Sequence, residues 1–358
     1  MNNKAVIAMS GGVDSSVAAY LMKQRGFDCI GVTMKLFANE DIGISREHSC
    51  CSLDDVEDAR SVAYSLDMPY YVFNFSDRFE TDVIDRFVHA YENGITPNPC
   101  IDCNRYLKFD KLYMRAKELD RDYVVTGHYA RVEKDENGRF LLKKALDDTK
   151  DQSYVLYCLT QEQLSHTIFP LGEMRKSQAR EIAESQGFIN ACKADSQDIC
   201  FVQNGSYADF IEQYTGKNYP DGDFLDKDGN IIGRHKGVIR YTVGQRKGLG
   251  ISAPEPLYVK AVNPVSNTVT LSYNDGLYSS IVKAGDINLI SVPEIKGEMR
   301  VKAKVRYRHT EQWATVTQNG ETLTAVFDEP QRAVTCGQAL VLYDGDIVVG
   351  GGTIIEVE

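Results

Sequence analysis

Long apolar runs and an excess of positive charge are both missing from this 358-residue sequence. No stretch approaches the ~18 apolar residues that a membrane-spanning helix needs, and residues 1–12 lack the cleavage site of a signal peptide. We therefore expect a cytoplasmic protein with no membrane partner. Lys and Arg number 40 against 51 Asp and Glu, which gives a net charge of −11. Such a field repels phosphate, so sequence-independent adhesion to nucleic acid is excluded and an RNA partner would need a local basic surface.

The nine cysteines are an odd number. Without a secretory signal, this count favours reduced thiols over a disulfide framework. Cys50 and Cys51 follow His48, but these ligands are too few for a metal site, so packing in a core is favoured for them. Four others are expected to be small buried apolar residues: Cys29, Cys158, Cys192 and Cys336.

Short apolar strands alternate with amphipathic helices in the first half of the chain, a pattern typical of a parallel sheet covered on both faces. The expected strands are residues 4–9, 29–34, 70–75 and 123–126. The expected helices are residues 15–25, one that begins at Ser52, 79–91 and 105–119. We predict an α/β fold with a doubly wound parallel sheet in residues 1–203. Glycine-rich and then β-type patterns follow, which predict a small central domain in residues 204–278 and a C-terminal β-barrel in residues 279–358.

A glycine-rich segment stands where the first expected strand ends and the first expected helix begins. It reads Ser10-Gly11-Gly12-Val13-Asp14-Ser15-Ser16. Its glycines let backbone N–H groups converge on an anion, and the helix N-terminus adds about half a positive charge. The segment is neither a Walker A loop nor G-x-G-x-x-G. It resembles the loop of the N-type ATP pyrophosphatases, which implies cleavage of ATP to AMP and pyrophosphate, with Asp14 helping to position Mg²⁺.

Two cysteines are suited to sulfur chemistry, which needs a thiolate that attacks a disulfide or persulfide and a second thiol that resolves the product. Cys103 lies in a proline-rich loop, residues 96–105, which is expected to enter a helix near Arg105. A helix N-terminus and a neighbouring arginine both favour a thiolate. Cys200 follows Asp198 and Ile199 after a helix and a loop.

Basic residues recur at alternate positions near the C-terminus: Arg300, Lys302, Lys304, Arg306 and Arg308. In a strand, all five would share one face. On an acidic protein this ladder indicates a steered contact with phosphate. His128 follows an expected strand at the carboxyl edge of the sheet, where either a structural role or a contact with a base or phosphate is open.

Six motifs occur in the order found in the tRNA-specific 2-thiouridylases, and this resemblance covers essentially the whole chain. They are residues 10–16 (SGGVDSS), 98–104 (NPCIDCN), 126–130 (TGHYA), 150–154 (KDQSY), 198–201 (DICF) and 241–249 (YTVGQRKGL). The resemblance implies an adenine-nucleotide α-hydrolase-like catalytic domain and a central domain that contacts tRNA. It also implies a sulfurtransferase that adenylates the 2-oxygen of the wobble uridine in Lys, Glu or Gln tRNA and replaces it with sulfur, using ATP and Mg²⁺.

The same resemblance assigns roles to residues. It implies that Cys200 carries a persulfide delivered by an upstream sulfur-relay protein or cysteine desulfurase, and that Cys103 is the nucleophile that forms a disulfide with Cys200. The positions that match ATP contacts are Ala8, Met9, Ser10, Gly11, Gly12, Val13, Asp14, Ser15, Met34 and Gly127. The positions that match tRNA contacts are Asn98, Pro99, Cys100, His128, Lys150, Asp151, Gln152, Arg306, Tyr307 and Gln338.

One departure from the family pattern leaves an alternative open. Many members have Asp where this chain has Cys100, which creates C-x-x-C with Cys103. Together with Cys200, these thiolates could instead hold a [4Fe–4S] cluster that binds free sulfide. Two other classes remain: an amide or C–N ligase on the same ATP-pyrophosphatase scaffold, which would leave the thiols without a purpose, and a non-catalytic nucleotide-sensing or tRNA-binding module.

Overall fold

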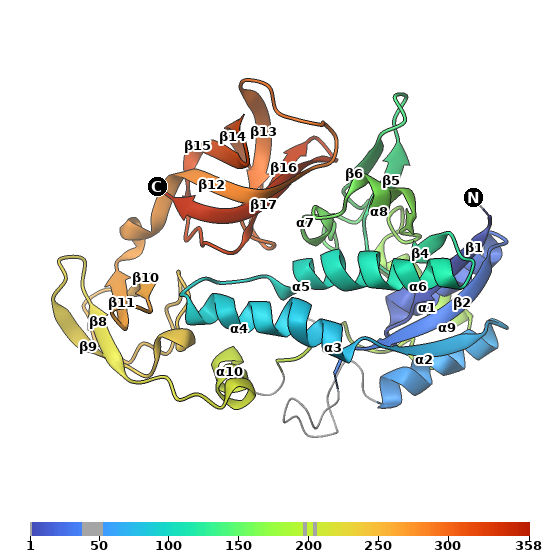
Figure 1. Cartoon of the computed structure of the whole chain (residues 1–358), viewed down its shortest axis with the longest axis horizontal. Helices are drawn as coiled ribbons and strands as arrows, with labels where there is room; N and C mark the ends of the chain where they lie inside the picture. Colours follow the sequence, from blue (N-terminus) through green and yellow to red (C-terminus); the bar gives the residue numbers. More distant parts are fainter. Residues whose placement is uncertain (1, 38–52, 196–198, 203–205) are drawn as a thin grey trace.

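A five-stranded parallel sheet forms the centre of the N-terminal part of the molecule. The computed structural model describes residues 2–37, 53–195, 199–202 and 206–358. The strand order is β3-β2-β1-β4-β7, which confirms the predicted doubly wound sheet (Figure 1). The strands are β1 (Lys4–Ala8), β2 (Asp28–Lys35), β3 (Tyr70–Asn74), β4 (Tyr123–Val125) and β7 (Thr167–Ile168).

The strands read as continuous apolar runs because helices cover both faces of the sheet. Alternate residues of β1 enter different cores: Ala5 and Ile7 pack in one cluster, and Val6 packs in the other. The first cluster includes the buried faces of α1 (Val13–Gln24), α2 (Leu53–Ser65) and α9 (Lys176–Ser185). The second includes side chains of α3 (Ser76–Phe79), the π-helix η1 (Glu80–Ile84), α4 (Asp85–Glu92), α5 (Pro99–Asp102), the π-helix η2 (Cys103–Lys111) and α6 (Leu112–Glu118).

The order of the strands reverses between β1 and β4, the position at which open parallel sheets bind ligands. Both strands pair in parallel, with Ile7 opposite Val125, so their carboxyl ends meet at one edge. The loop after β1 and the segment from Thr126 after β4 therefore face each other. The fold brings these two motifs together although more than a hundred residues separate them.

The central and C-terminal parts are β-rich, as predicted. The central sheet has the order β10-β11-β8-β9 and lies at the opposite end of the molecule from β1 and β2 (Figure 1). Its strands are β8 (Gly222–Leu225), β9 (Ile231–His235), β10 (Tyr258–Asn263) and β11 (Thr268–Ser272), with α10 (Tyr207–Thr215) and the 3₁₀ turns η3 (Val238–Arg240) and η4 (Asn274–Leu277) beside them in sequence.

Six C-terminal strands close into a barrel because β12 pairs with both β15 and β17. They are β12 (Tyr278–Leu289), β13 (Met299–Lys304), β14 (Gln312–Asn319), β15 (Thr322–Arg332), β16 (Ala339–Asp344) and β17 (Ile347–Val357). A hairpin that the sequence patterns did not reveal, β5 (Arg131–Lys134) and β6 (Phe140–Lys143), joins this sheet through β17. The barrel is thereby attached to the N-terminal half of the chain. The short helices α7 (Ser153–Leu156) and α8 (Gln161–Ser165) follow the hairpin.

Two of the differences from the expected boundaries bear on the functional residues. The helix expected from Arg105 begins at Pro99, because Asn98 has an extended backbone and proline suits the first helical position, where no N–H partner is needed. The basic strand ends at Lys304, so Arg306 and Arg308 do not continue it. The helix start expected at Ser52 lies outside the described residues. No helix among the described residues is long and apolar enough to cross a membrane.

Candidate active site

A cavity of about 810 Å³ lies at the carboxyl edge of the parallel sheet. Its wall combines the loop after β1, the end of β4, the start of α5 and a segment on either side of residues 196–198. The residues expected to contact ATP that line it are Ala8, Met9, Ser10, Gly12, Val13, Asp14, Ser15, Met34 and Gly127. The three cysteines singled out from the sequence, Cys100, Cys103 and Cys200, line the same cavity.

The loop after β1 has one conformation that only glycine permits at Gly11. Its φ is +75°, and a Cβ there would lie 2.4 Å from the backbone oxygen of Asp55. Two side chains from a distant segment hold the Gly11 carbonyl: Asn190 Nδ2 donates at 2.9 Å and Lys193 Nζ at 3.3 Å. The loop is therefore held in one conformation. This conformation presents the N–H groups at the start of α1 to an anion.

Gly127 allows β4 to approach this loop. A Cβ on Gly127 would lie 2.7 Å from the carbonyl carbon of Asp14 and 2.8 Å from the nitrogen of Ser15. Any larger residue would push the two segments apart. The close approach explains why a glycine stands after β4, a position that the sequence alone indicated only through family resemblance.

A buried lysine that sequence reasoning missed joins the loop to the far side of the cavity. Lys176 Nζ donates to both oxygens of Asp14 at 2.7 Å and forms an ion pair with Asp195 at 2.8 Å. Tyr129 also donates to Asp14 Oδ1, at 2.8 Å. Asp195 in turn binds Lys150 at 2.8 Å. Lys176 opens an amphipathic helix, where a lysine is ordinarily a surface residue, so no local signal identified it.

These contacts determine the charges of the network. Burial raises the pKa of Asp195, but the opposing hydrogen bonds from Lys150 and Lys176 are stronger in sum and lower its pKa to about 2. Burial and the neighbouring Asp14 carboxylate raise the pKa of Tyr129 well above its usual range. At neutral pH Asp195 is therefore a carboxylate and Tyr129 keeps a neutral hydroxyl.

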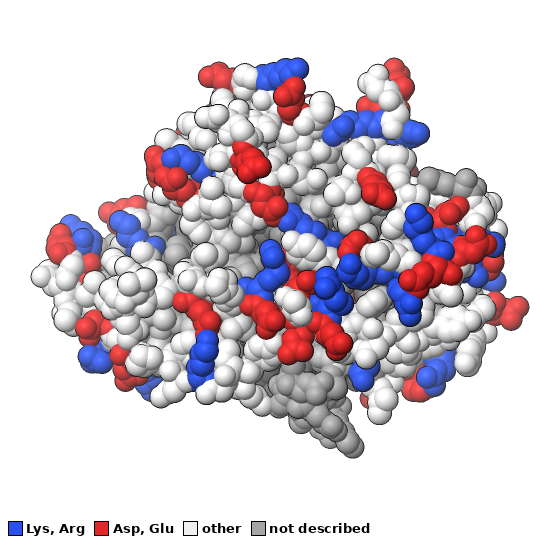
Figure 2. Space-filling model, viewed as in Figure 1, with Lys and Arg blue, Asp and Glu red and all other residues white. Residues whose placement is uncertain are grey.

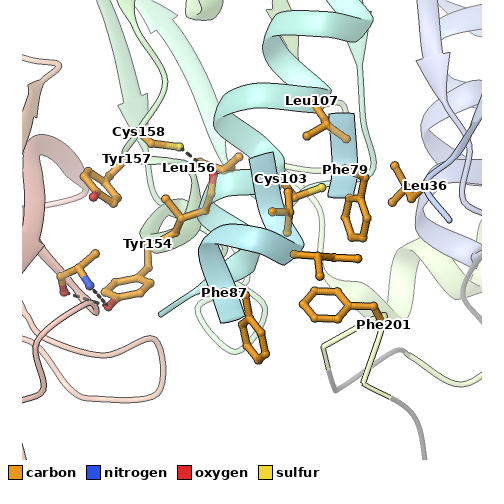
Figure 3. Close-up of a cluster of buried hydrophobic side chains, with 14 of the residues drawn as sticks. Leu36, Phe79, Phe87, Cys103, Leu107, Tyr154, Leu156, Tyr157, Cys158 and Phe201 are labelled. Atoms are coloured by element: carbon orange, nitrogen blue, oxygen red, sulfur yellow. Dashed lines mark hydrogen bonds between the residues drawn. The ribbon is translucent and has the colours of Figure 1, made fainter. Parts of the chain in front are cut away.

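Cys100 and Cys103 are one helical turn apart. The Cys103 N–H donates to the carbonyl oxygens of Cys100 and Pro99. Cys103 is 8% exposed and packs in the core, between Leu107 and Phe79 (Figure 3), whereas Cys100 is exposed. Because the helix begins at Pro99, Cys103 is in its second turn rather than at its N-terminus as expected. Arg105 forms an ion pair with Asp286.

Cys200 is half-buried, and the next residue anchors it. Phe201 is 1% exposed and its ring packs edge-on against Phe79 at 5.7 Å and Phe87 at 5.1 Å. It also lies 5.1 Å from the ring of Phe210. These contacts hold the residue after Cys200 against α3, α4 and α10. Figure 3 shows Phe201, Phe79 and Phe87 in the same cluster as Cys103. The motif residue Asp198 lies outside the described residues.

The expectations for the other cysteines are met in part. Cys29 and Cys158 are buried as predicted, while Cys192 is exposed and Cys336 half-buried. Cys192 precedes Lys193 in the turn segment that follows α9. Cys50 and Cys51 lie outside the described residues.

The residues expected to contact tRNA fall into two groups. Pro99, Cys100, His128, Lys150, Gln152 and Tyr307 line the cavity. Gln338 instead donates to the carbonyl oxygens of Thr96 and Pro97 at 2.9 and 3.1 Å, and so supports the segment that leads to Asn98. Arg306 donates to Val243 and Thr335, and Asp151 accepts from Ser153 at 2.7 Å. Their side chains brace the segments that form the wall.

His128 is held in a neutral state. Its Nδ1 lies 2.7 Å from the Thr126 hydroxyl, and its ring packs on Phe109 and Phe169. Burial, with a smaller effect of the Lys108 charge, holds the pKa of His128 well below its usual range. Its ring can therefore exchange neutral hydrogen bonds at the cavity wall but is not a cation at neutral pH.

The predicted ladder of five basic residues on one strand face is wrong. Only Arg300, Lys302 and Lys304 belong to β13, and Arg300 is paired with Asp328. Arg306 lies two residues beyond the end of β13, in a bend, and its side chain is partly buried. Lys and Arg side chains gather over α4 to α6 in Figure 2, but they alternate there with Asp and Glu. Among the described residues, the basic side chains that line the cavity are those of Lys108, Lys150 and Lys193.

A metal centre is not preformed in the described part of the chain. No group of three or more His, Cys, Asp or Glu side chains there is arranged to hold a metal ion.

Comparison with known families covers nearly the entire chain. Residues 3–204 match the family model described as tRNA methyl transferase HUP domain. Residues 208–273 match the tRNA methyl transferase PRC-barrel domain, and residues 279–354 the aminomethyltransferase beta-barrel domain.

Full-length relatives are about half identical to this chain. A protein of Clostridioides difficile named tRNA-specific 2-thiouridylase MnmA is 52% identical over 356 residues, which cover 99% of this chain and 98% of that protein. A protein of the same name from Lachnoclostridium phytofermentans is 52% identical and covers 99% of both chains. One from Clostridium perfringens is 49% identical and covers 98% of both. The chain therefore belongs to the tRNA-specific 2-thiouridylase family.

Proposed function

We propose that this chain is a tRNA sulfurtransferase that uses ATP to replace the 2-oxygen of a tRNA uridine with sulfur. The observation that carries the proposal is the single cavity lined by a phosphate-binding turn and by Cys100, Cys103 and Cys200. Activation of an oxygen and delivery of sulfur must occur at the same carbon atom. Both sets of groups therefore have to reach one substrate base, as this wall permits.

ATP binding is assigned to the loop between β1 and α1. The fixed Gly11 carbonyl and the N-terminus of α1 suit a pyrophosphate group, with Met34 and Gly127 beside it. Asp14 has a carboxylate at the cavity and is chemically suited to Mg²⁺. In this structure Lys176 occupies both of its oxygens. Binding of Mg²⁺ would require Lys176 to yield one of these contacts, and its charge would then be available to a phosphate oxygen.

The first chemical step joins substrate and nucleotide. The uracil 2-oxygen attacks the α-phosphorus, the bond to pyrophosphate breaks, and an adenylated base forms. The adenylate converts a poor leaving group into AMP. The base must leave its stack to reach this cavity, and Pro99, His128, Lys150 and Tyr307 are the wall residues that we assign to its contacts.

Sulfur transfer follows in two bond changes. The terminal sulfur of a Cys200 persulfide attacks C2 of the adenylated uracil and AMP departs. The Cys103 thiolate then attacks the Cys200 sulfur, the bond to the transferred sulfur breaks, and its electron pair stays with the 2-thio group. A Cys103–Cys200 disulfide remains. A sulfur-relay protein or cysteine desulfurase is the proposed source of the persulfide.

The domain assignment is part of this proposal. We assign catalysis to residues 1–203, a tRNA contact to residues 204–278, and support of the 96–98 segment to the barrel in residues 279–358, through Gln338.

The test combines purified protein, unmodified tRNA, ATP and a persulfide donor. We expect tRNA-dependent release of pyrophosphate and formation of 2-thiouridine, measured by mass spectrometry of digested tRNA. Cys103→Ser and Cys200→Ser should both lose thiolation while ATP binding persists. Cys192→Ser is the matched control because Cys192 is exposed and is not part of the cavity wall. Pyrophosphate release that depends on an amine or carboxylate instead of tRNA would favour a C–N ligase and overturn the proposal.

The [4Fe–4S] route is the second candidate because three thiols share one cavity. Their present arrangement does not form a metal-binding group within the described residues, so we route no step through a cluster. Anaerobic purification with iron and sulfide analysis separates the two routes: four irons per chain would replace the persulfide mechanism.

A further inference from the structure

Cys100 has a position that the sulfur-transfer steps above do not use. It is the exposed member of the C-x-x-C pair and lines the cavity. The backbone hydrogen bond from the Cys103 N–H to the Cys100 carbonyl places the two residues one tight turn apart. Side chains at i and i+3 in such a turn lie nearly one above the other, so their sulfur atoms can approach each other by side-chain rotation.

The proposed reaction leaves a disulfide that is poorly placed for an outside reductant. Cys103 is 8% exposed and is surrounded by core side chains, including Leu107 and Phe79 (Figure 3). Cys200 is half-buried, and its neighbour Phe201 packs into the aromatic cluster. Attack on a disulfide needs access along the S–S axis. An exposed thiol within the same cavity could move the disulfide to a more accessible position.

We propose that Cys100 is a resolving cysteine, which regenerates the enzyme by attacking Cys103 in the Cys103–Cys200 disulfide. A bond forms between the Cys100 and Cys103 sulfurs, the Cys103–Cys200 bond breaks, and its electron pair leaves on the Cys200 sulfur. The proton lost by Cys100 is balanced by the proton gained by Cys200. Cys200 is thus free to accept the next persulfide, and a dithiol reductant then reduces the Cys100–Cys103 disulfide, being itself oxidised to a disulfide. This inference rests on the proposed function.

The surroundings of Cys100 fit a group that acts late. Cys100 is exposed as a residue, but its thiol lies at the cavity wall, where removal from water raises the pKa of Cys100 and the nearby Lys108 charge opposes that effect. The resting group is therefore a thiol, which has to lose its proton when it attacks Cys103. Lys108 has no hydrogen-bond or ion-pair partner in the part of the chain that the structure describes, so its charge is available to an anionic sulfur.

The test maps the disulfide after one turnover. Enzyme loaded with persulfide by a cysteine desulfurase and cysteine is mixed with ATP and unmodified tRNA without reductant. Remaining thiols are then blocked with N-ethylmaleimide and the digested protein is analysed by mass spectrometry. We expect a Cys100–Cys103 disulfide in the wild type and a Cys103–Cys200 disulfide in Cys100→Ser.

The second readout is the ratio of the steady-state rate with a dithiol to the first-turnover rate. We expect this ratio to fall at least tenfold in Cys100→Ser and to stay at the wild-type value in Cys192→Ser, whose thiol is exposed but outside the cavity wall. A wild-type enzyme that makes 2-thiouridine but keeps a Cys103–Cys200 disulfide, or a Cys100→Ser ratio equal to wild type, would overturn this inference alone. Absence of 2-thiouridine in the wild-type first turnover would overturn the proposed function itself.

Discussion

Phe201 provides the sharpest test of how the sulfur-bearing segment is held in the cavity. Its side chain is 1% exposed, and its ring contacts Phe79, Phe87 and Phe210 at centroid distances of 5.7, 5.1 and 5.1 Å. Truncation of a buried Phe to Ala costs about 3–5 kcal/mol. Because Cys200 is the adjacent residue, we expect the substitution mainly to weaken the packing of residues 199–202 against the cavity wall. Its effect on global unfolding should be smaller.

The magnitude can be converted into an activity. A loss of about 3 kcal/mol reduces the population of a seated segment by roughly 100-fold relative to the unseated one. We therefore expect Phe201→Ala to lower single-turnover formation of 2-thiouridine by at least about tenfold. The tRNA-dependent release of pyrophosphate should stay within about threefold of wild type, because the loop between β1 and α1 lies in the other core cluster.

The assay needs a control with the same chemistry elsewhere. Phe188→Ala removes a ring that is 6% exposed and that packs edge-on against Tyr20 at 6.5 Å, in the core cluster that does not contain Cys103 or Cys200. Thermal unfolding would report the stability of both variants, and Phe201→Leu should recover part of the transfer activity by refilling the volume. If Phe201→Ala lost pyrophosphate release and thiolation equally, and Phe188→Ala showed the same losses, the claim that Phe201 acts locally on the Cys200 segment would be refuted.

Three further predictions address the other groups of the cavity. Gly127→Ala should weaken ATP binding about tenfold or more, measured by equilibrium binding, because its Cβ would lie 2.7 Å from the Asp14 backbone; unchanged affinity would contradict the close approach. Hydrogen bonds outweigh burial and lower the pKa of Asp195 to about 2, so the stability that its ion pairs contribute is present above about pH 4 and lost as the pH falls toward 2. In urea unfolding, the free energy of unfolding of Lys176→Met should fall less than that of the wild type over this pH range. An unaltered pH dependence of this free energy in the variant would count against the network. Lys108→Met should lower kcat/KM for tRNA thiolation about tenfold. The control Lys111→Met, whose lysine pairs with Asp110 on the same helix, should keep wild-type kinetics. Equal effects of the two substitutions would show that Lys108 has no specific role in the cavity.

The sequence alone determined those features that depend on local patterns. Apolar strands separated by amphipathic helices specified the doubly wound sheet, because each pattern can be buried in only one way. The glycine-serine loop was legible because backbone conformation and helix polarity are set within a few residues. Cys103 was indicated by its place near an expected helix start and an arginine, but the roles of Cys103 and Cys200 came from the family resemblance, since an isolated cysteine is most often a small apolar core residue.

Tertiary structure decided everything that depends on contacts between distant segments. Lys176 opens a helix that resembles a surface helix, yet it lies between Asp14 and Asp195 because α9 packs against α1. The β5–β6 hairpin gave no clear signal because β6 pairs with the barrel strand β17, some two hundred residues later. The basic ladder failed because alternation cannot tell where a strand ends. Only the fold determines which charged groups are neutralised by carboxylates and which remain in the cavity, since that choice depends on neighbours that no local pattern encodes.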